Sequence, residues 1–310
     1  MNDRLVTVFG GGGFLGRYVV RALLAQGARV RVAGRDPKNA WFLKTQGGLG
    51  QTQFVAADVR NAGSVARALA GADAAVNLVG ILKGDFTAFH VEGPRNVAQG
   101  AANAGCGALV HISAIGADAA SASAYGKSKG EGEAAVRAAF ASATILRPSV
   151  VFGREDGFVN RFAGLIAALP VVPVIRGAAR FQPVYVGDVA DAVTATLGDP
   201  AAHGGKTYEL GGPQVISMRE LNVWIARSTG RAGRFVAMPD AVAGAMASLT
   251  GWLPGAPMTR DQWLMLQSDN VVTGTDGLAA LGIAPTPLDA VGDGWLVKYR
   301  RHGRFTTVGD

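Results

Sequence analysis

The sequence has one cysteine, four histidines and few charged residues for its length. Cys106 cannot form a disulfide within the chain, and the histidines lack the short spacings that are typical of metal ligands. The four are His90, His111, His203 and His302. We therefore expect no metal site. Charged residues make up 17% and hydrophobic residues 49% of the 310 residues, which excludes a disordered chain and favours a large buried core.

Long hydrophobic runs are also absent. No stretch of about 18 or more apolar residues is free of Pro, Gly and charge, so we expect no membrane-spanning helix. Residues 1–4 lead directly into an apolar strand, which leaves no room for a signal peptide. The sequence therefore predicts a cytoplasmic protein.

Short apolar segments alternate with helical ones through the first half of the chain. We expect strands at residues 5–9, 29–33, 54–57, 74–79, 109–113 and 144–146, with helical segments between most of them. Continuous apolar strands are buried on both faces, as in parallel sheets. The alternation predicts the α/β class, with a doubly wound parallel sheet of the Rossmann type.

After residue 152 the pattern changes. We expect a stretch rich in loops, which is marked by Pro170, Pro173 and Pro183. Asp188 is then expected to cap a helix that ends at Leu197. A strand is expected at 206–210. Capping boxes then indicate two more helix starts, at Ser217 with Glu220 and at Thr259 with Gln262.

Two domains fit this organisation. We assign residues 1–152 and 179–216 to the Rossmann domain. We assign 153–178 and 217–310 to a smaller C-terminal lid or substrate domain.

The turn after the first strand carries a glycine motif. Gly10, Gly13 and Gly16 form G-x-x-G-x-x-G between a strand and a helix. Glycine lets the backbone approach a pyrophosphate, and the helix N-terminus supplies N–H groups and a positive dipole end. This context predicts a dinucleotide site, formed at the turn by Gly10, Gly12, Gly13, Phe14, Leu15 and Gly16.

The residues after the second strand bear on the choice of dinucleotide. NAD sites usually place an acidic residue here to bind the ribose hydroxyls, but this chain has Arg35 and Lys38 around Asp36. Two cations favour the 2′-phosphate, and hence NADP(H) over NAD(H). In the competing interpretation, Asp36 binds the ribose and Arg35 stacks on the adenine.

Other strand ends supply further candidate cofactor residues. Asp58 and Val59 follow the third strand, on the adenine side, and Asn77, Val79 and Gly80 end the fourth, on the ribose side. We also assign Pro148 and Val150, beyond the sixth strand, to the site. The alternative for the residues at the third and fourth strands is ordinary loop capping.

Tyr125 and Lys129 are the candidate catalytic pair. At i and i+4 they lie on one face of a helix after the fifth strand. The ammonium can lower the pKa of the phenol and hold the nicotinamide ribose, and the phenol can donate a proton to a carbonyl that accepts hydride. In the alternative, the pair only holds the ribose.

These motifs together resemble the extended and atypical short-chain dehydrogenase/reductases over nearly the whole chain. The resemblance includes Leu146-Arg147-Pro148 and residues 184–189. More narrowly, residues 13–17, 111–118 and 183–190 resemble the family of the nucleotide-binding accessory subunit of respiratory complex I (alpha-subcomplex subunit nine) and its bacterial relatives. The bacterial members are usually called NAD-dependent epimerase/dehydratases. The complex I subunit holds NADPH as a structural component.

One departure from the resemblance matters for catalysis. Active members place Ser or Thr after the fifth strand, where this chain has Ala114. Ser113, Ser121 or Ser123 could take that role. The resemblance therefore implies either an oxidoreductase that uses Tyr125, Lys129 and Ser113, or a non-catalytic NADPH-holding assembly or accessory subunit associated with respiratory complex I.

The second half contains an apolar segment and a basic tail. Residues 236–257 carry one charge, and Trp252, Leu253, Pro254 and Gly255 form an apolar tip. The segment either covers the cleft for a small apolar carbonyl or quinone-like substrate, or it faces lipid or quinone.

The tail contains Lys298, Arg300, Arg301, His302 and Arg304, in a chain with a net charge of +7. It is either a solvated face or a contact for anionic headgroups or an acidic partner. We expect weak association with a membrane surface, on the inner face of the cell membrane, or with a respiratory complex. We expect no nucleic-acid binding, because no RNA-binding motif is present.

Overall fold

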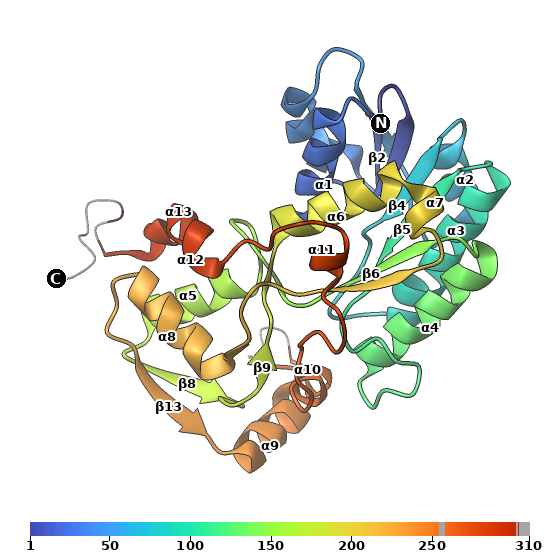
Figure 1. Ribbon diagram of the computed structural model, residues 1–310. Coiled ribbons are helices and arrows are strands. Elements are labelled where there is room, and N and C mark those ends of the chain that lie inside the picture. The colour runs from blue at the N-terminus through green and yellow to red at the C-terminus, as the bar shows by residue number, and fades with distance from the viewer. Residues whose placement is uncertain (254–257, 302, 304–310) are drawn as a thin grey trace. The chain divides into compact units, whose positions relative to one another are not determined.

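The computed structural model describes residues 1–253, 258–301 and 303. The chain divides into two compact units (Figure 1). The first comprises residues 1–148, 186–210 and 274–284, and the second comprises 149–185, 211–273 and the chain from 285 onward. Residues 274–284, which the sequence analysis placed in the smaller domain, cluster with the first unit.

The first unit is built on a parallel sheet of seven strands. Its order is β11-β6-β5-β4-β1-β2-β3. The strands are β1 (Leu5–Phe9), β2 (Arg29–Gly34), β3 (Thr52–Ala56), β4 (Ala74–Asn77), β5 (Ala108–Ile112), β6 (Thr144–Pro148) and β11 (Thr207–Leu210). Every pairing is parallel. The α/β doubly wound sheet predicted from the sequence is therefore confirmed.

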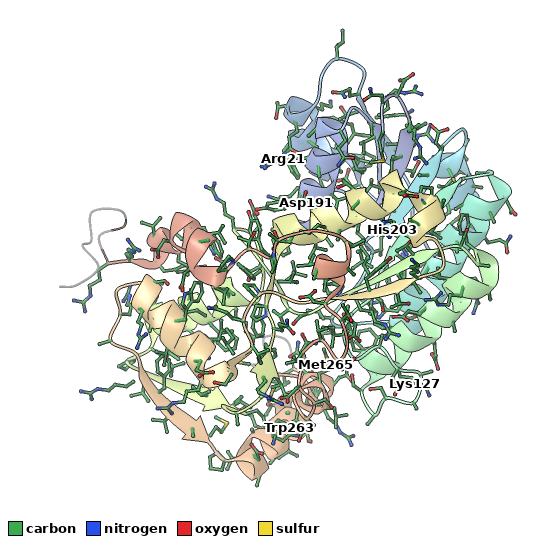
Figure 2. All side chains as sticks on the ribbon, viewed as in Figure 1. Arg21, Lys127, Asp191, His203, Trp263 and Met265 are labelled. Atoms are coloured by element: carbon green, nitrogen blue, oxygen red, sulfur yellow. The ribbon has the colours of Figure 1, made fainter. Side chains whose placement is uncertain are left out.

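Helices cover this sheet. They are α1 (Phe14–Ala25), η1 (Pro37–Gln46), α2 (Ala62–Leu69), η2 (Thr87–Glu92), α3 (Gly93–Asn103), α4 (Ala124–Ala139), α6 (Val186–Gly198), α7 (Pro200–His203) and α11 (Gly277–Ala280). Helix α1 packs on α6, and α2, α3 and α4 pack in succession. Figure 2 shows Arg21 of α1 near Asp191 of α6. Burial raises the pKa of the Asp191 carboxyl, and the Arg21 guanidinium acts in the opposite direction.

Alternating side chains of the strands explain the two layers of helices. Phe9, Ala75 and Leu109 belong to one buried cluster with apolar residues of α2, α3 and α4, whereas Val6 and Val8 are buried outside that cluster. Successive residues of a strand point to opposite faces of the sheet. Both faces are therefore covered, which is why the central strands β1, β4 and β5 are buried along nearly their whole length.

The second unit contains short strands and small helices. They are β7 (Val151–Phe152), α5 (Val159–Ala168), β8 (Val171–Ile175), β9 (Arg180–Phe181), β10 (Val184–Tyr185), β12 (Ile216–Ser217), α8 (Met218–Ser228), β13 (Arg234–Met238), α9 (Asp240–Thr250), α10 (Arg260–Met265), α12 (Leu288–Val291), α13 (Asp293–Leu296) and η3 (Val297–Tyr299). Strand β8 pairs with β13 in parallel. The largest hydrophobic core of the second unit lies around α5 and α8.

The starts of three helices and the proline-marked stretch bear on local predictions from the sequence. Both predicted capping boxes are present, at Ser217 before α8 and at Thr259 before α10. Asp188 lies within the first turn of α6, so its assignment as the cap was wrong. The stretch expected to be loop-rich contains α5, which ends before Pro170, and β8, which includes Pro173, because apolar residues of both pack into cores of the second unit.

Candidate functional site

A cleft of about 750 Å³ opens in the first unit at the carboxyl ends of β1, β2 and β4. Between β1 and β4 the strand order reverses, and open α/β sheets bind ligands at this point. The cleft is lined by the glycine turn and by later loops: Phe9, Gly10, Gly12–Gly16, Val32–Pro37, Asn39, Ala40, Ala57–Val59, Leu78–Ile81 and Phe89.

The glycine turn is shaped by close backbone contacts. Gly10 has a φ of +81°, which L side chains rarely adopt. A Cβ atom on Gly16 would lie 2.5 Å from the Gly11 carbonyl carbon, so no side chain fits between the first turn of α1 and the glycine turn. In the described structure no side chain caps α1, and its first turn has no acidic residue. Its N-terminal N–H groups and dipole are therefore suited to an anion beside Gly13 and Phe14, which line the cleft.

The residues after β2 have distinct roles. Arg35 and Asp36 both line the cleft, whereas Lys38 is exposed and does not. The Asp36 carboxylate accepts a hydrogen bond from the Lys38 backbone N–H at 3.0 Å and caps η1. Among the described residues that line the cleft, Arg35 is the one with a cationic side chain. The Arg35 guanidinium lies 5.9 Å from the centroid of the Phe89 ring, which also lines the cleft.

Asp58 and Asn77 are both engaged with neighbours. Asp58 forms an ion pair with Arg60 at 2.6 Å, and the hydrogen bond from that guanidinium lowers the pKa of the carboxyl. Asn77 lies beneath the cleft, where its Oδ1 accepts the Val79 N–H at 3.1 Å and its Nδ2 lies 3.2 Å from His111 Nδ1. Asp58, Val79 and their neighbours Val59 and Gly80 line the cleft, but Asn77 supports it from below.

Lys129 is a buried cation in α4. Its Nζ donates a hydrogen bond to the Ile112 carbonyl of β5 at 2.9 Å, and only 4% of the residue is exposed. Burial lowers the pKa of Lys129 to about 8, against the attraction of Glu133 one turn away. The ammonium form therefore predominates at neutral pH.

The pKa of Tyr125 shifts upward. We expected the ammonium of Lys129 to lower it, but burial raises it to about 12. The phenol is therefore protonated at neutral pH and able to act as a proton donor.

Ser113, directly after β5, has an unsatisfied hydroxyl. Its backbone N–H bonds the Leu146 carbonyl at 2.7 Å, and the residue is 4% exposed. Among the described residues no group hydrogen-bonds its Oγ. Ser123 and Ser121 are engaged locally, because Ser123 Oγ caps α4 and Ser121 Oγ accepts the Ser123 N–H. Of these three serines, Ser113 is therefore the one whose hydroxyl has no hydrogen-bond partner in the described structure.

Two further assignments lie away from the cleft lining. The carbonyl of Pro148, at the end of β6, accepts the Ile115 N–H at 3.1 Å. Val150 belongs to the second unit, where its N–H bonds Asn270 Oδ1 at 3.0 Å. Neither residue lines the cleft, and Ser113, Tyr125 and Lys129 do not line it either.

The role of His90 was not predicted from the sequence. This buried residue of η2 bonds the backbone of Ile81 in the cleft wall and Ser128 of α4. Its ring also lies edge-on to Tyr125, with centroids 5.4 Å apart. No motif signals such a bridge, because its partners lie 9 and 38 residues away in the sequence.

The site combines a glycine-lined nucleotide cleft with a Tyr-Lys helix, and comparison with known proteins agrees with it. The profile of the NAD dependent epimerase/dehydratase family matches residues 6–211. The chain belongs to this family. It has an NAD(P)-binding fold of the epimerase/reductase kind.

Relatives differ in their named roles. NADH dehydrogenase (ubiquinone) 1 alpha subcomplex subunit 9, mitochondrial, of Mus musculus is 36% identical over 92% of this chain and 78% of its own length. Ceramide reductase of Caulobacter vibrioides is 32% identical over 63% of this chain and 62% of its own. The structure of an NADPH-dependent quinone oxidoreductase from Escherichia coli, complexed with NADPH, superposes with a TM-score of 0.75 at 21% identity, covering 92% of this chain and 97% of that one. The chain therefore has both complex I subunits and reductases among its relatives.

The second unit exposes apolar side chains. Leu249 and Trp252 are each 73% exposed, and Val242 of α9 is also exposed, whereas Ala243 and Ala247 face the core. Helix α9 occupies most of the apolar segment, but its large apolar residues are not buried. Pro254 and Gly255 of the predicted tip lie outside the described residues.

The basic tail is partly tied down. Arg300 bonds the Ser228 carbonyl at 3.0 Å and Asp293 at 3.2 Å, with 11% of its side chain exposed, so it is not a free cation. Arg301 is exposed, and His302 and Arg304 lie outside the described residues. Within residues 1–253, 258–301 and 303, no helix is long and apolar enough to cross a membrane, and no cluster of His, Cys, Asp or Glu could hold a metal.

Proposed function

We propose that this protein is an NADP(H)-dependent oxidoreductase that acts on a small apolar carbonyl or quinone-like substrate. The observation that carries the proposal is that Lys129 of α4 bonds the Ile112 carbonyl at the end of β5, directly before the buried and unpartnered hydroxyl of Ser113. The same helix carries Tyr125, whose phenol is protonated, one turn before the Lys129 ammonium. A purely structural core would leave such a hydroxyl unsatisfied only at a cost of about 1–3 kcal/mol.

The residues of the cleft fit a dinucleotide. The glycine turn leaves room for a pyrophosphate against the N–H groups of α1, since no side chain fills it. Arg35 lines the cleft and its guanidinium suits a 2′-phosphate, while one carboxylate oxygen of Asp36 accepts the Lys38 N–H as the cap of η1. The preference for NADP(H) over NAD(H) rests on this pair. When bound, the nicotinamide supplies or accepts hydride.

The side chains near β5 would do the proton chemistry. Ser113 Oγ would donate a hydrogen bond to the substrate carbonyl and orient it. The Tyr125 phenol would give its proton to the carbonyl oxygen, and the Lys129 ammonium would hold the ribose and stabilise the phenolate that forms. The apolar substrate is supported by residues 236–257, which carry one charge, and by a relative named ceramide reductase.

The experiment measures NADPH oxidation with a panel of apolar aldehydes, ketones and quinones. Tyr125→Phe should lower kcat/KM by at least about 100-fold, the range for losing a general acid, with NADPH affinity unchanged. Tyr208→Phe is the matched control, since Tyr208 Oη pairs with His203 elsewhere in the first unit. Equal activity of Tyr125→Phe and the unmutated protein would refute the role of the phenol.

The pH dependence follows from Lys129. Its charged form predominates below a pKa of about 8, so kcat/KM should fall about tenfold per pH unit above that value. Tyr125 remains protonated over this range, because its pKa is about 12. A profile that stays flat to pH 10 would contradict the role of the ammonium.

The second candidate function is a non-catalytic NADPH-holding subunit associated with respiratory complex I. It is favoured by Ala114 at the position of the usual hydroxyl and by the name of the Mus musculus relative. On this view the protein would be peripheral on the inner face of the cell membrane, held weakly by the exposed side chains of α9 and by Arg301. Tight NADPH binding without oxidation by any substrate of the panel would favour this candidate.

A further inference from the structure

His90 connects the two parts of the site within the first unit. The N–H of Ile81, which lines the dinucleotide cleft, bonds His90 Nε2 at 2.9 Å. On the other side of the ring, His90 Nδ1 lies 2.9 Å from the hydroxyl of Ser128, in α4 between Tyr125 and Lys129. The residue is 1% exposed, so water does not compete for these bonds.

The hydrogen bonds define one tautomer of the ring. A backbone N–H can only donate, so Nε2 must carry the lone pair that accepts from Ile81. The Ser128 hydroxyl donates to the Tyr125 carbonyl at 2.8 Å, so it must accept from Nδ1–H. The chain of donors therefore runs from His90 Nδ1–H through Ser128 Oγ–H to the backbone of Tyr125.

The ring is held neutral and in place. Burial and, to a smaller extent, the Lys129 ammonium lower the pKa of His90 to about 4. The backbone of His90 also touches α4, where a Cβ on Gly132 would overlap the His90 carbonyl oxygen. Phe86 stacks on the ring with centroids 5.3 Å apart. The imidazole is therefore neutral, and its neighbours hold it in this orientation.

We propose that His90 is a positioning residue that clamps the cleft wall at Ile81 to the Tyr125–Lys129 helix. One nitrogen sets the wall against which the dinucleotide lies, and the other sets the first turn of α4 and hence the phenol. The two ring nitrogens have separable effects. The bond at Nε2 affects dinucleotide affinity, and the bond at Nδ1 affects turnover. The turnover half rests on the proposed function, and the affinity half does not.

The test separates the nitrogens by substitution. Glutamine places a polar atom near the position of Nε2, asparagine near that of Nδ1, and leucine replaces neither. His90→Leu should weaken NADPH binding about tenfold, the upper range for a lost hydrogen bond, while His90→Gln should restore it to within about threefold. His90→Asn should bind NADPH weakly but keep a higher kcat than His90→Leu.

A measurement on the unmutated protein avoids any effect of misfolding. Nitrogen-15 NMR of the ring should show a protonated Nδ1 and an unprotonated Nε2, with no titration between pH 5.5 and 8. His203→Gln is the matched control, because His203 bonds Tyr208 elsewhere in the first unit and lies outside the cleft lining (Figure 2). It should leave NADPH affinity unchanged.

Other results would overturn the proposal. A ring protonated on Nε2, or equal NADPH affinity in His90→Leu and the unmutated protein, contradicts the clamp. Both readouts are independent of turnover. A protein that shows the predicted tautomer and affinities but oxidises no NADPH would contradict the proposed enzyme and leave the clamp intact.

Discussion

The two units use buried polar groups in different ways. In the second unit, Asp156 bonds the N–H groups of Gly153 and Val159 to start α5, and Asn270 Oδ1 bonds Ser149 and Val150. These side chains brace loops. In the first unit, His90 and Lys129 join α4 to the cleft wall and to the end of β5. Ser113 Oγ has no partner among the described residues, and neither do Asn222 Oδ1 and Trp295 Nε1 in the second unit. The difference is therefore one of placement, because the polar groups of the first unit border the nucleotide cleft and the second unit exposes apolar side chains.

The largest effect is expected from a pair of helical glycines, one in each unit. Gly16→Ala should destabilise the protein by about 3 kcal/mol, because the new methyl group would press on the backbone of Gly11. Gly164→Ala, in α5, meets no atom within 4 Å and should stabilise it by about 0.5–1 kcal/mol through helix propensity. Urea unfolding of both variants makes the comparison. Equal stabilities would mean that the glycine turn is not tightly packed.

The cofactor preference sharpens the comparison. Arg35→Asp should weaken NADPH relative to NADH by about 1–3 kcal/mol, because it removes a charged hydrogen bond to the 2′-phosphate and adds repulsion. The control is Arg180→Asp in the second unit, at a residue that pairs with Asp269 and should leave the ratio unchanged. Calorimetric titration measures both affinities. Tighter binding of NADH than NADPH to the unmutated protein would contradict the predicted preference.

The smallest effect concerns the apolar surface. Leu249→Ser with Trp252→Ser should lower cosedimentation with anionic liposomes about fivefold at low salt, because each side chain loses apolar contact. The control makes the same changes in the first unit, at the exposed residues Leu49 and Trp41. A loss of the same size in the control would show that the second unit has no special affinity. No pelleting at low salt by the unmutated protein would remove the lipid interpretation.

Much of the fold could be predicted from the sequence, and less of the site. The strands, the glycine turn and the capping boxes depend on neighbours within a few residues. Helix η1 was not predicted, because its start is a cap by Asp36 that we weighed as a ribose ligand. The upward shift of the Tyr125 pKa could not be predicted either, since it depends on burial by residues far along the chain.

The sequence by itself determined the parallel sheet, the dinucleotide turn and the placement of Tyr125 and Lys129 on one helical face. These features follow from side-chain periodicity and from the special backbone freedom of glycine, which act locally. Only the tertiary structure decided which polar groups remain available to a ligand. It committed Asp36 to a cap, left Ser113 Oγ unsatisfied and made His90 a bridge. Hydrogen-bond partners are chosen by proximity in space, and residues 38 positions apart become neighbours only when the sheet has formed.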